Sequence, residues 1–535
     1  MMCLRQVPGQ NGRMSLAIIH SRAIAGLLAQ PVRVEADLAN GLPQLSIVGL
    51  PDTAVREARD RVRAAIVNSG FEFPQRRITI NLAPADLPKD SGRFDLPMAL
   101  GILAASGQLG VEYGSRIGAC EFLGELSLTG GLLPVRGAFA LALGMLRDPT
   151  SKAQLVLPIG NRAEVSLSGS ARIGFAATLR QLAACLISGQ ELDGPAAAPG
   201  DSVLRPDDPA EHLIWQAVEG QHPARRAALV AAAGQHNLLM FGPPGVGKSM
   251  IAGRMPAMLP DLSLEQACEL AAVTSLNGAI DPQQWRRPPL RSPHHSTPAR
   301  ALIGGGHPVQ PGEMSLAHHG LLFMDEFPEF ARDALEALRE PLETSEICVA
   351  RVRDRVRLPA DILLVAAMNP CPCGYFGTLH ARRTCRCTPD RILRYRSRIS
   401  GPLLDRFDLA IHLESDTGDA GSAKGEQQGQ LSPAPVPGDA ESPAAMVRRV
   451  RQIALARQSC TNARLDVDML KEHATLDSRS EKLLQETARS KGWSMRARHR
   501  VQRVARTLAD IGNSPHITWP HLAEAIELRR ALDMV

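Results

Sequence analysis

The 535-residue chain has no run of about 18 or more apolar residues, the length that a helix needs to cross a bilayer, so we expect no membrane span. It also lacks a basic segment followed by an apolar stretch at its start, so we expect no secretory signal and a cytoplasmic location. Lysine is scarce, since only 7 of the 60 basic residues are Lys. The net charge of +5 is small for this length, and the excess of Arg does not by itself indicate nucleic-acid binding.

Cysteine is present without a secretory signal, which favours reduced thiols or a metal site over disulfides. Four of the 10 Cys form two close pairs, Cys371-Pro-Cys373 and Cys385-Arg-Cys387. Four thiolates in two pairs match a closed structural Zn²⁺ site, although the C-x-C spacing is tighter than the usual one. His380 lies between the pairs as a spare ligand. Four unrelated buried Cys are the alternative, but a segment with so little apolar content needs a metal to supply folding energy.

A phosphate-binding loop is the most specific motif in the chain. The pattern G-x-x-x-x-G-K-[ST] is matched by Gly242, Pro243, Pro244, Gly245, Val246, Gly247, Lys248 and Ser249. The glycines let backbone N–H groups surround the β-phosphate of ATP, Lys248 supplies a positive charge, and Ser249 offers a hydroxyl to Mg²⁺. The loop lies between an expected buried strand over 237–241 and an expected helix, which is the usual context of a nucleotide site.

Further polar residues follow expected strands and suit an ATPase. The apolar run 320–324 ends in Asp325, expected to hold the Mg²⁺ shell, and Glu326, expected to orient and deprotonate water. The run 362–368 ends at Asn369, which fits a sensor of the γ-phosphate.

Two arginines are candidates for the same chemistry. Arg406 could reach a neighbouring subunit's nucleotide as an arginine finger, or could form a surface ion pair with Asp405 or Asp408. Arg496 opens an expected helix and could contact the γ-phosphate from a lid.

The length and the 44% apolar content allow about two to four domains. Alternating short strand and helix patterns, two Pro- and Gly-rich segments, and a final helical pattern divide the chain. The predicted units are an extension expected to be disordered (1–13), an α/β domain (14–188), a linker (189–208), an ATPase core (209–413) with the Cys₄ insertion at 371–387, a flexible linker (414–443) and a helical lid (444–535).

Motifs along nearly the whole chain carry a family resemblance. They are Met14-Ser-Leu-Ala-Ile-Ile-His-Ser-Arg22, Ile47-Val-Gly-Leu-Pro-Asp52, Glu219-Gly220, Arg291-Ser-Pro-His-His295, Gly312-Glu-Met-Ser-Leu-Ala-His318, Asn369-Pro-Cys-Pro-Cys373-Gly and Arg398-Ile-Ser-Gly-Pro-Leu-Leu-Asp-Arg406. In these motifs the chain resembles the ComM/YifB competence-related proteins, within the magnesium-chelatase branch of AAA+ ATPases. The resemblance implies an AAA+ core with a parallel sheet and a helical lid. It also implies a hexameric ATPase, with ATP and Mg²⁺, that drives branch migration of DNA in recombination, as in natural transformation. The implied partners are single-stranded and branched DNA, with recombination proteins as further candidates.

The N-terminal domain is similar to the Lon-protease (S5-type) fold. The segment 124–134 resembles the Lon segment that precedes the catalytic Lys, and in that register Phe139 takes the Lys position. Arg93 takes the place of the nucleophilic Ser, and Ser91 is displaced from it. A Ser–Lys dyad needs both partners within hydrogen-bond reach, so we expect a non-proteolytic domain.

The stretch 346–357 alternates around a central charged turn and predicts a β-hairpin. Arg351, Arg353 and Arg355 would present one basic face, and in related ring helicases a hairpin at this place enters the channel and holds DNA. An exposed hairpin with solvated charges is the alternative. The Arg-rich segment 382–398 is a second candidate phosphate-facing surface. Another candidate pore loop contains His294 and His295.

The sequence is compatible with three functions. They are a DNA-translocating motor, a chelatase-type ATPase that remodels a protein partner for metal insertion, and an ATP-dependent protease. The substituted dyad weighs against the protease, and the Cys₄ insertion, basic hairpin and N-terminal domain weigh against the chelatase. We therefore predict the DNA motor.

Overall fold

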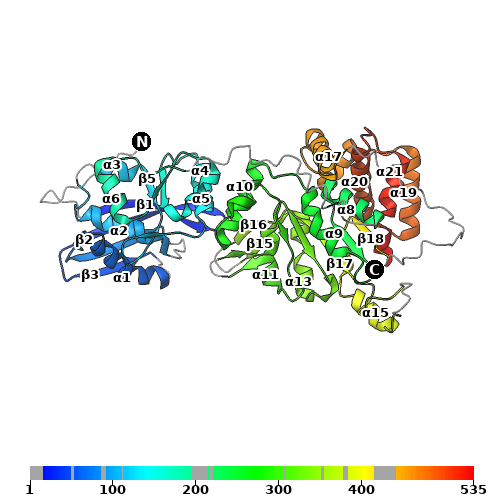
Figure 1. Cartoon of the computed structure of the whole chain (residues 1–535), viewed down its shortest axis with the longest axis horizontal. Helices are drawn as coiled ribbons and strands as arrows, with labels where there is room; N and C mark the ends of the chain where they lie inside the picture. Colours follow the sequence, from blue (N-terminus) through cyan, green and yellow to red (C-terminus); the bar gives the residue numbers. More distant parts are fainter. Residues whose placement is uncertain are drawn as a thin grey trace.

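The computed structural model describes residues 16–49, 53–85, 92–110, 113–195, 215, 221–306, 309–350, 355–377, 384–414 and 441–534. In Figure 1 an N-terminal α/β unit, blue to cyan, lies beside a second α/β unit in green, and C-terminal helices, orange to red, pack at its far end. This mixed α/β architecture with a parallel sheet and a helical C-terminal region agrees with the expected fold class. No helix in these ranges is both long and apolar enough to cross a bilayer.

The N-terminal unit is built on a seven-stranded mixed sheet in the order β3-β4-β2-β1-β5-β8-β9. In the strand Arg77–Ala83 every second side chain enters the core, so that Ile78, Ile80 and Leu82 are fully buried. The strands are β1 (Leu16–Ala25), β2 (Leu28–Ala39), β3 (Gln44–Val48), β4 (Arg77–Ala83), β5 (Cys120–Phe122), β8 (Gln154–Pro158) and β9 (Ile173–Ala176), with a separate ribbon of β6 (Glu125–Leu126) and β7 (Leu132–Leu133). The helices are α1 (Thr53–Asn68), α2 (Asp95–Ala105), α3 (Tyr113–Gly118), α4 (Ala138–Arg147), α5 (Arg162–Val165) and α6 (Leu179–Ser188).

The second unit contains a sheet of five parallel strands. In spatial order they are β11 (Leu290–Arg291), β14 (Leu321–Met324), β17 (Leu363–Met368), β10 (Leu238–Phe241) and β18 (Leu409–His412). Every residue of β10, β14 and β17 is buried, as expected for parallel strands with both faces covered. These are the strands predicted at 237–241, 320–324 and 362–368. Their carboxyl ends meet at one edge of the sheet, where open α/β sheets bind ligands.

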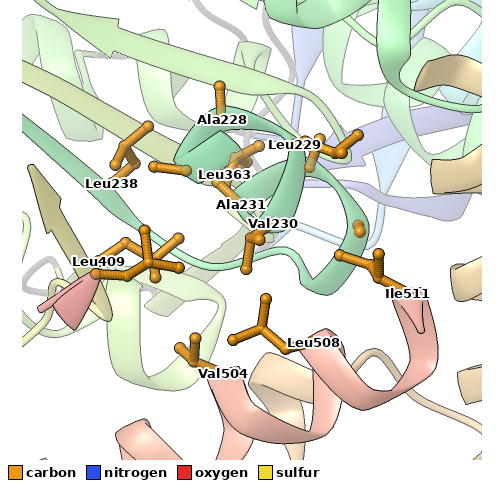
Figure 2. Packing of buried hydrophobic residues seen from close by; sticks show 14 of the residues in the cluster. Ala228, Leu229, Val230, Ala231, Leu238, Leu363, Leu409, Val504, Leu508 and Ile511 are labelled. Carbon is orange, nitrogen blue, oxygen red and sulfur yellow. The ribbon is translucent and has the colours of Figure 1, made fainter. Parts of the chain in front are cut away.

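One face of this sheet shares a continuous core with the C-terminal helices. Figure 2 shows residues of α8 (His222–Gly234) near sheet residues such as Leu238 and Leu409, with Val504 and Leu508 of α20 (Met495–Ile511) close by. These four side chains are at most 2% exposed. The C-terminal helices are therefore held to the sheet by a common core. The others are α17 (Pro443–Gln458), α18 (Val467–His473), α19 (Ser478–Lys491) and α21 (Trp519–Glu527).

Short elements and a β-hairpin cover the other face of the sheet. The hairpin pairs β15 (Glu346–Ala350) with β16 (Arg355–Pro359), which confirms the hairpin predicted from the sequence. Ile347 and Leu358 of the hairpin enter the core on this side. The remaining elements of the unit are α9 (Lys248–Arg254), α10 (Leu264–Asn277), α11 (Ala299–Ile303), the ribbon of β12 (Gly304–Gly305) and β13 (Gln310–Pro311), α12 (Glu313–Leu316), α13 (Arg332–Ala337), α14 (Pro341–Thr344), α15 (Pro389–Arg396) and α16 (Gly401–Leu404).

Helices α4 and α10 join the two units. The Phe139 ring of α4 lies 6.1 Å from the Trp285 ring, and both side chains are buried in a small apolar cluster that spans the two units. Ser275 of α10 accepts a hydrogen bond from the Gly137 N–H to its carbonyl oxygen at 2.9 Å and one from the Ala140 N–H to its Oγ at 3.3 Å. The N-terminal unit is thus attached to the second unit by packing as well as by the connecting chain.

Candidate functional site

The phosphate-binding loop follows β10 at the carboxyl edge of the parallel sheet. Gly245 and Gly247 have φ angles of 84° and 91°, which residues with a side chain rarely adopt. A Cβ on Gly242 would lie 2.5 Å from the carbonyl oxygen of Leu413. The glycines of the motif are therefore needed for the path of the loop, which is completed by Pro243, Pro244 and Val246.

Lys248 is turned back into the loop. Its Nζ donates hydrogen bonds to the carbonyl oxygens of Gly242 at 2.5 Å and Pro243 at 2.8 Å, and to Oδ1 of Asn369 at 3.0 Å. The side chain is buried, and burial lowers the pKa of Lys248 to about 8, although nearby carboxylates oppose the shift. Phosphate oxygens would replace the carbonyl partners and favour the charged ammonium.

The acidic pair after β14 meets the same loop. Ser249 Oγ donates to Asp325 Oδ2 at 2.6 Å. A hydroxyl and a carboxylate in contact are hard oxygen ligands of the kind that Mg²⁺ prefers, so these residues fit a Mg²⁺-nucleotide site. The Glu326 N–H donates to Asp325 Oδ1 at 2.9 Å, and Glu326 has a left-handed φ of 50°.

The strand order explains why these groups meet. Because β17 lies between β10 and β14, Asn369 at its end lies between the loop and the acidic pair. The structure thus brings together five of the predicted residues at one edge, namely Lys248, Ser249, Asp325, Glu326 and Asn369.

His295 also belongs to this edge, although the sequence placed it in a candidate pore loop. Its Nδ1 lies 3.2 Å from Glu326 Oε2, and its ring stacks on His294 with 4.0 Å between ring centroids. The one indication in the sequence was the motif that ends at His295, which follows β11, the strand paired with β14. The carboxylate expected to act as the base therefore already has an imidazole partner.

Arg406 lies at the opposite edge of the sheet from the loop. The side chain of Asn237, which directly precedes β10, donates to the Arg406 carbonyl oxygen at 3.0 Å. The Arg406 guanidinium is buried and bonds Glu343 Oε2 at 2.6 Å, so it forms an ion pair, with a partner that the sequence did not suggest. Burial lowers the pKa of Arg406, and the nearby charges of Arg500 and Arg496 act in the same direction while Glu343 opposes them. Arg500 of α20 donates to the Arg406 carbonyl oxygen at 3.3 Å, and Arg496 lies one turn before it in the same helix, so Arg496 is on the Arg406 side of the sheet.

The four predicted cysteine ligands lie together. The sulfur atoms of Cys371 and Cys373 are 3.2 Å apart, and Cys385 Sγ lies 3.7 Å and 3.6 Å from them. Cys387 completes a group in which all sulfur atoms are within 4.8 Å. Thiolates at about 2.3 Å from a tetrahedral Zn²⁺ would be about 3.8 Å apart, so the group fits such an ion. The spare ligand His380 lies outside the described residues.

A second cluster of metal-ligand types has different chemistry. Glu269 Oε2 lies 3.1 Å from His319 Nε2 and 3.6 Å from His318 Nε2. The His318 Nδ1 accepts the Asp361 N–H at 3.0 Å, so neutral His318 carries its proton on Nε2 and has no lone pair there for a metal. The two imidazoles hold the pKa of Glu269 at about 2, and the cluster ties α10 to the start of β14.

The candidate DNA residues are described only in part. Arg351 and Arg353 lie outside the described residues, as does the side chain of Arg355, although its backbone pairs with Ala350 in the hairpin. Arg357, two positions further on, is 77% exposed and lies 3.6 Å from Glu346.

Comparisons with known proteins agree with this arrangement. Models of three magnesium-chelatase families match the chain: subunit ChlI of Mg-chelatase over 34–161, magnesium chelatase subunit ChlI over 214–420, and the ChlI C-terminal region over 439–529. YifB of Escherichia coli is 45% identical over 96% of this chain and 97% of its own length. The chain belongs to the ComM/YifB family of magnesium-chelatase-like proteins.

Two further relatives are similar to the chain over different shares of its length. The competence protein ComM of Haemophilus influenzae is 41% identical over 96% of the chain and 98% of its own length. The magnesium-chelatase 38 kDa subunit of Rhodobacter capsulatus is 26% identical over 29% of the chain and 50% of its own length. A ComM/YifB protein with a magnesium-chelatase-type AAA+ core is expected to use ATP and Mg²⁺, in agreement with the geometry of the loop.

Proposed function

We propose that the chain is an ATP-hydrolysing AAA+ motor that acts on DNA and promotes branch migration of recombination intermediates, as in natural transformation. The observation that carries the ATPase part is the meeting of a lysine, a hydroxyl, two carboxylates and an amide at one edge of a parallel sheet. The DNA part is supported by the nearly full-length match to a relative named as a competence protein and by the basic hairpin.

The roles within the ATP site follow from chemistry. Lys248 balances the charge of the β- and γ-phosphates, while Ser249 and Asp325 hold Mg²⁺. Glu326 orients and deprotonates the attacking water, and Asn369 hydrogen-bonds the γ-phosphate or that water.

We propose that the working form is a homo-hexamer in which Arg406 and Arg496 serve the nucleotide of the next subunit. Both belong to the side of the sheet opposite their own phosphate-binding loop, since Arg406 lies at that edge and Arg500, one turn after Arg496, contacts it. The ion pair with Glu343 would hold Arg406 in place until a neighbouring nucleotide offers a stronger anionic partner. An arginine supplied in trans stabilises charge on the transferred phosphoryl group.

We propose that the β15–β16 hairpin holds the DNA backbone through Arg351, Arg353 and Arg355. The described part of the hairpin supports a basic face, because Val356 and Leu358 are buried while Arg357 is exposed. The Arg357 side chain therefore faces away from the core. Phosphate contacts do not read sequence, which suits a motor for single-stranded and branched DNA.

The N-terminal unit is proposed to be a Lon-protease-like domain without peptidase activity. Phe139 is completely buried against the second unit, and Arg93 is 5% exposed. Neither side chain can act as the base or nucleophile of a dyad. Ser91 lies outside the described residues. We retain the predicted division into 14–188, 209–413 and 444–535, and propose one structural Zn²⁺ at the four cysteines.

A chelatase-type function is the alternative, with a protein partner that inserts metal. The three family models named for magnesium chelatase and the match to a magnesium-chelatase subunit favour it. That subunit, however, is 26% identical over 29% of the chain, whereas the ComM/YifB relatives are 41% and 45% identical over 96%. We therefore keep the DNA motor as the proposal.

The test is ATP hydrolysis with and without branched DNA. We expect branched DNA to stimulate hydrolysis, and Arg351→Ala with Arg353→Ala to remove the stimulation and flatten the salt dependence of DNA binding. Arg530→Ala is a matched control, because Arg530 is an exposed arginine with a carboxylate partner, far from the hairpin in sequence. An equal rate of hydrolysis with and without branched DNA would contradict the motor and favour the chelatase-type alternative.

A further inference from the structure

The cysteine cluster is built directly onto the nucleotide site. Asn369, whose amide contacts Lys248, is followed at once by Pro370 and Cys371, and Cys371 is completely buried. A turn follows, in which the Gly374 N–H donates to the Cys371 carbonyl oxygen at 2.9 Å. The first cysteine pair is therefore a continuation of the strand that carries the proposed sensor.

This turn touches the phosphate-binding loop. Gly374 has a φ of 86° and is buried, and a Cβ at this position would lie 2.6 Å from Cδ of Pro244 in the loop. The turn and the loop thus approach as closely as a glycine allows. A displacement of the turn would remove the atoms against which this side of the loop rests.

The second cysteine pair leads into α15, which returns to the same place. Arg396 at the end of α15 donates two hydrogen bonds of 3.2 Å to the Pro370 carbonyl oxygen and a third to the carbonyl oxygen of Met534. Its guanidinium lies 5.4 Å from the centroid of the Phe241 ring and 5.5 Å from that of Phe376. Phe241 is the last residue of β10 before the loop.

Two sets of contacts therefore link the cysteine cluster to the phosphate-binding loop, and both begin at segments that carry the cysteine sulfur atoms. The Gly374 turn follows the first pair, and the Arg396 side chain follows the second pair. We propose that the metal bound by the four cysteines holds the phosphate-binding loop in its nucleotide-binding conformation, so that metal occupancy regulates ATP binding. This inference rests on the proposed ATP and Zn²⁺ sites.

The first experiment measures zinc and nucleotide on the same full-length protein. Zinc content is determined after purification under reducing conditions, and a fluorescent ATP analogue is titrated with Mg²⁺ present. A pyridyl chelator that removes Zn²⁺ and leaves Mg²⁺ should weaken binding about tenfold, and added Zn²⁺ should restore it. Circular dichroism checks that the depleted protein remains folded. Unchanged affinity in folded, zinc-free protein would overturn the inference.

A pair of glycine variants separates the contact from the metal. Gly374→Ala introduces a side chain against Pro244, whereas Gly377→Ala has a similar positive φ of 73° and nothing within 4 Å. Both variants should retain Zn²⁺, but only Gly374→Ala should bind the analogue weakly, by about tenfold. Cys348→Ser, at an exposed thiol outside the cluster, should match the wild type. Equal affinities in the two glycine variants would contradict the inference.

The outcomes of these experiments also distinguish failure of this inference from failure of the proposed ATP site or Zn²⁺ site. Protein without zinc would remove the metal site and the inference with it, while the ATP site could still bind the analogue. Zinc-loaded protein that binds no nucleotide would refute the ATP site itself and, with it, the regulation inferred here.

Discussion

ATP should bind this chain about ten times more weakly at pH 9 than at pH 7, because Lys248 loses its charge between these values. Lys248 is 7% exposed, and burial lowers its pKa from 10.5 to about 8 even though Asp325 and Glu326 oppose the shift. ATP phosphates are fully ionised above about pH 7, so they contribute little to the change.

The sign follows from linkage. Bound phosphates favour the charged ammonium, so the pKa of Lys248 is higher in the complex and binding takes up a proton as the pH rises above 8. With a pKa near 8 in the free protein, about nine-tenths of the lysines are charged at pH 7 and about one-tenth at pH 9. The dissociation constant should rise by the ratio of these fractions, which is about tenfold. This change corresponds to about 1.4 kcal/mol of binding free energy.

The assay is a titration with a fluorescent ATP analogue at pH 7, 8 and 9 and constant ionic strength. Lys248→Arg is the matched control, because Arg remains charged throughout this range and should give a flat profile even if its affinity is lower. A constant dissociation constant in the wild type, or the same slope in Lys248→Arg, would refute the reasoning.

Three other substitutions test the rest of the assembly. Glu326→Gln should keep ATP binding and lower the hydrolysis rate about 100-fold or more, so that filter binding detects trapped ATP; normal turnover would exclude Glu326 as the base. Arg406→Ala should lower hydrolysis about 1,000-fold, and mixing it with Lys248→Ala should restore activity if the arginine acts in trans; mixed rings without recovery would argue otherwise. Phe139→Ala should cost about 3–5 kcal/mol at the interface between the units and lower the melting temperature measured by calorimetry, whereas Leu128→Ala, at a side chain that is 57% exposed, should change it little.

The parts that the sequence predicted well are those that depend on neighbouring residues. The run 237–241 predicts a buried strand because its last four residues are apolar and a glycine-rich loop with Lys248 and Ser249 follows it directly. The hairpin was predictable for a similar reason, since alternation and a charged turn are local features. The cysteine group needed only the close spacing of its members.

The contacts that the sequence did not predict join residues from neighbouring strands or from distant turns. His295 meets Glu326 because β11 lies beside β14, and strand order is not encoded in the local pattern around either residue. Gly374 meets Pro244 because β17 lies beside β10. The sequence allows an ion pair of Arg406 with Asp405 or Asp408, but the guanidinium instead reaches Glu343, which is 63 positions away.

The position of the C-terminal helices limits how ATP can be hydrolysed. Arg496 opens α20, and Val501, Val504 and Leu508 of that helix are at most 2% exposed in the core shared with α8 and the sheet. Moving Arg496 to its own phosphate-binding loop would break this core, at a cost of several kcal/mol for three large apolar side chains. The chain therefore carries the loop at one edge of its sheet and two arginines on the other side: α20 with Arg496 is held by this core, and Arg406 lies between Leu403 and Phe407 of the core on the other face. In the proposed hexamer, an ATP site that uses both halves requires a second copy of the chain, so we expect the specific hydrolysis rate to increase with protein concentration until the proposed rings are complete.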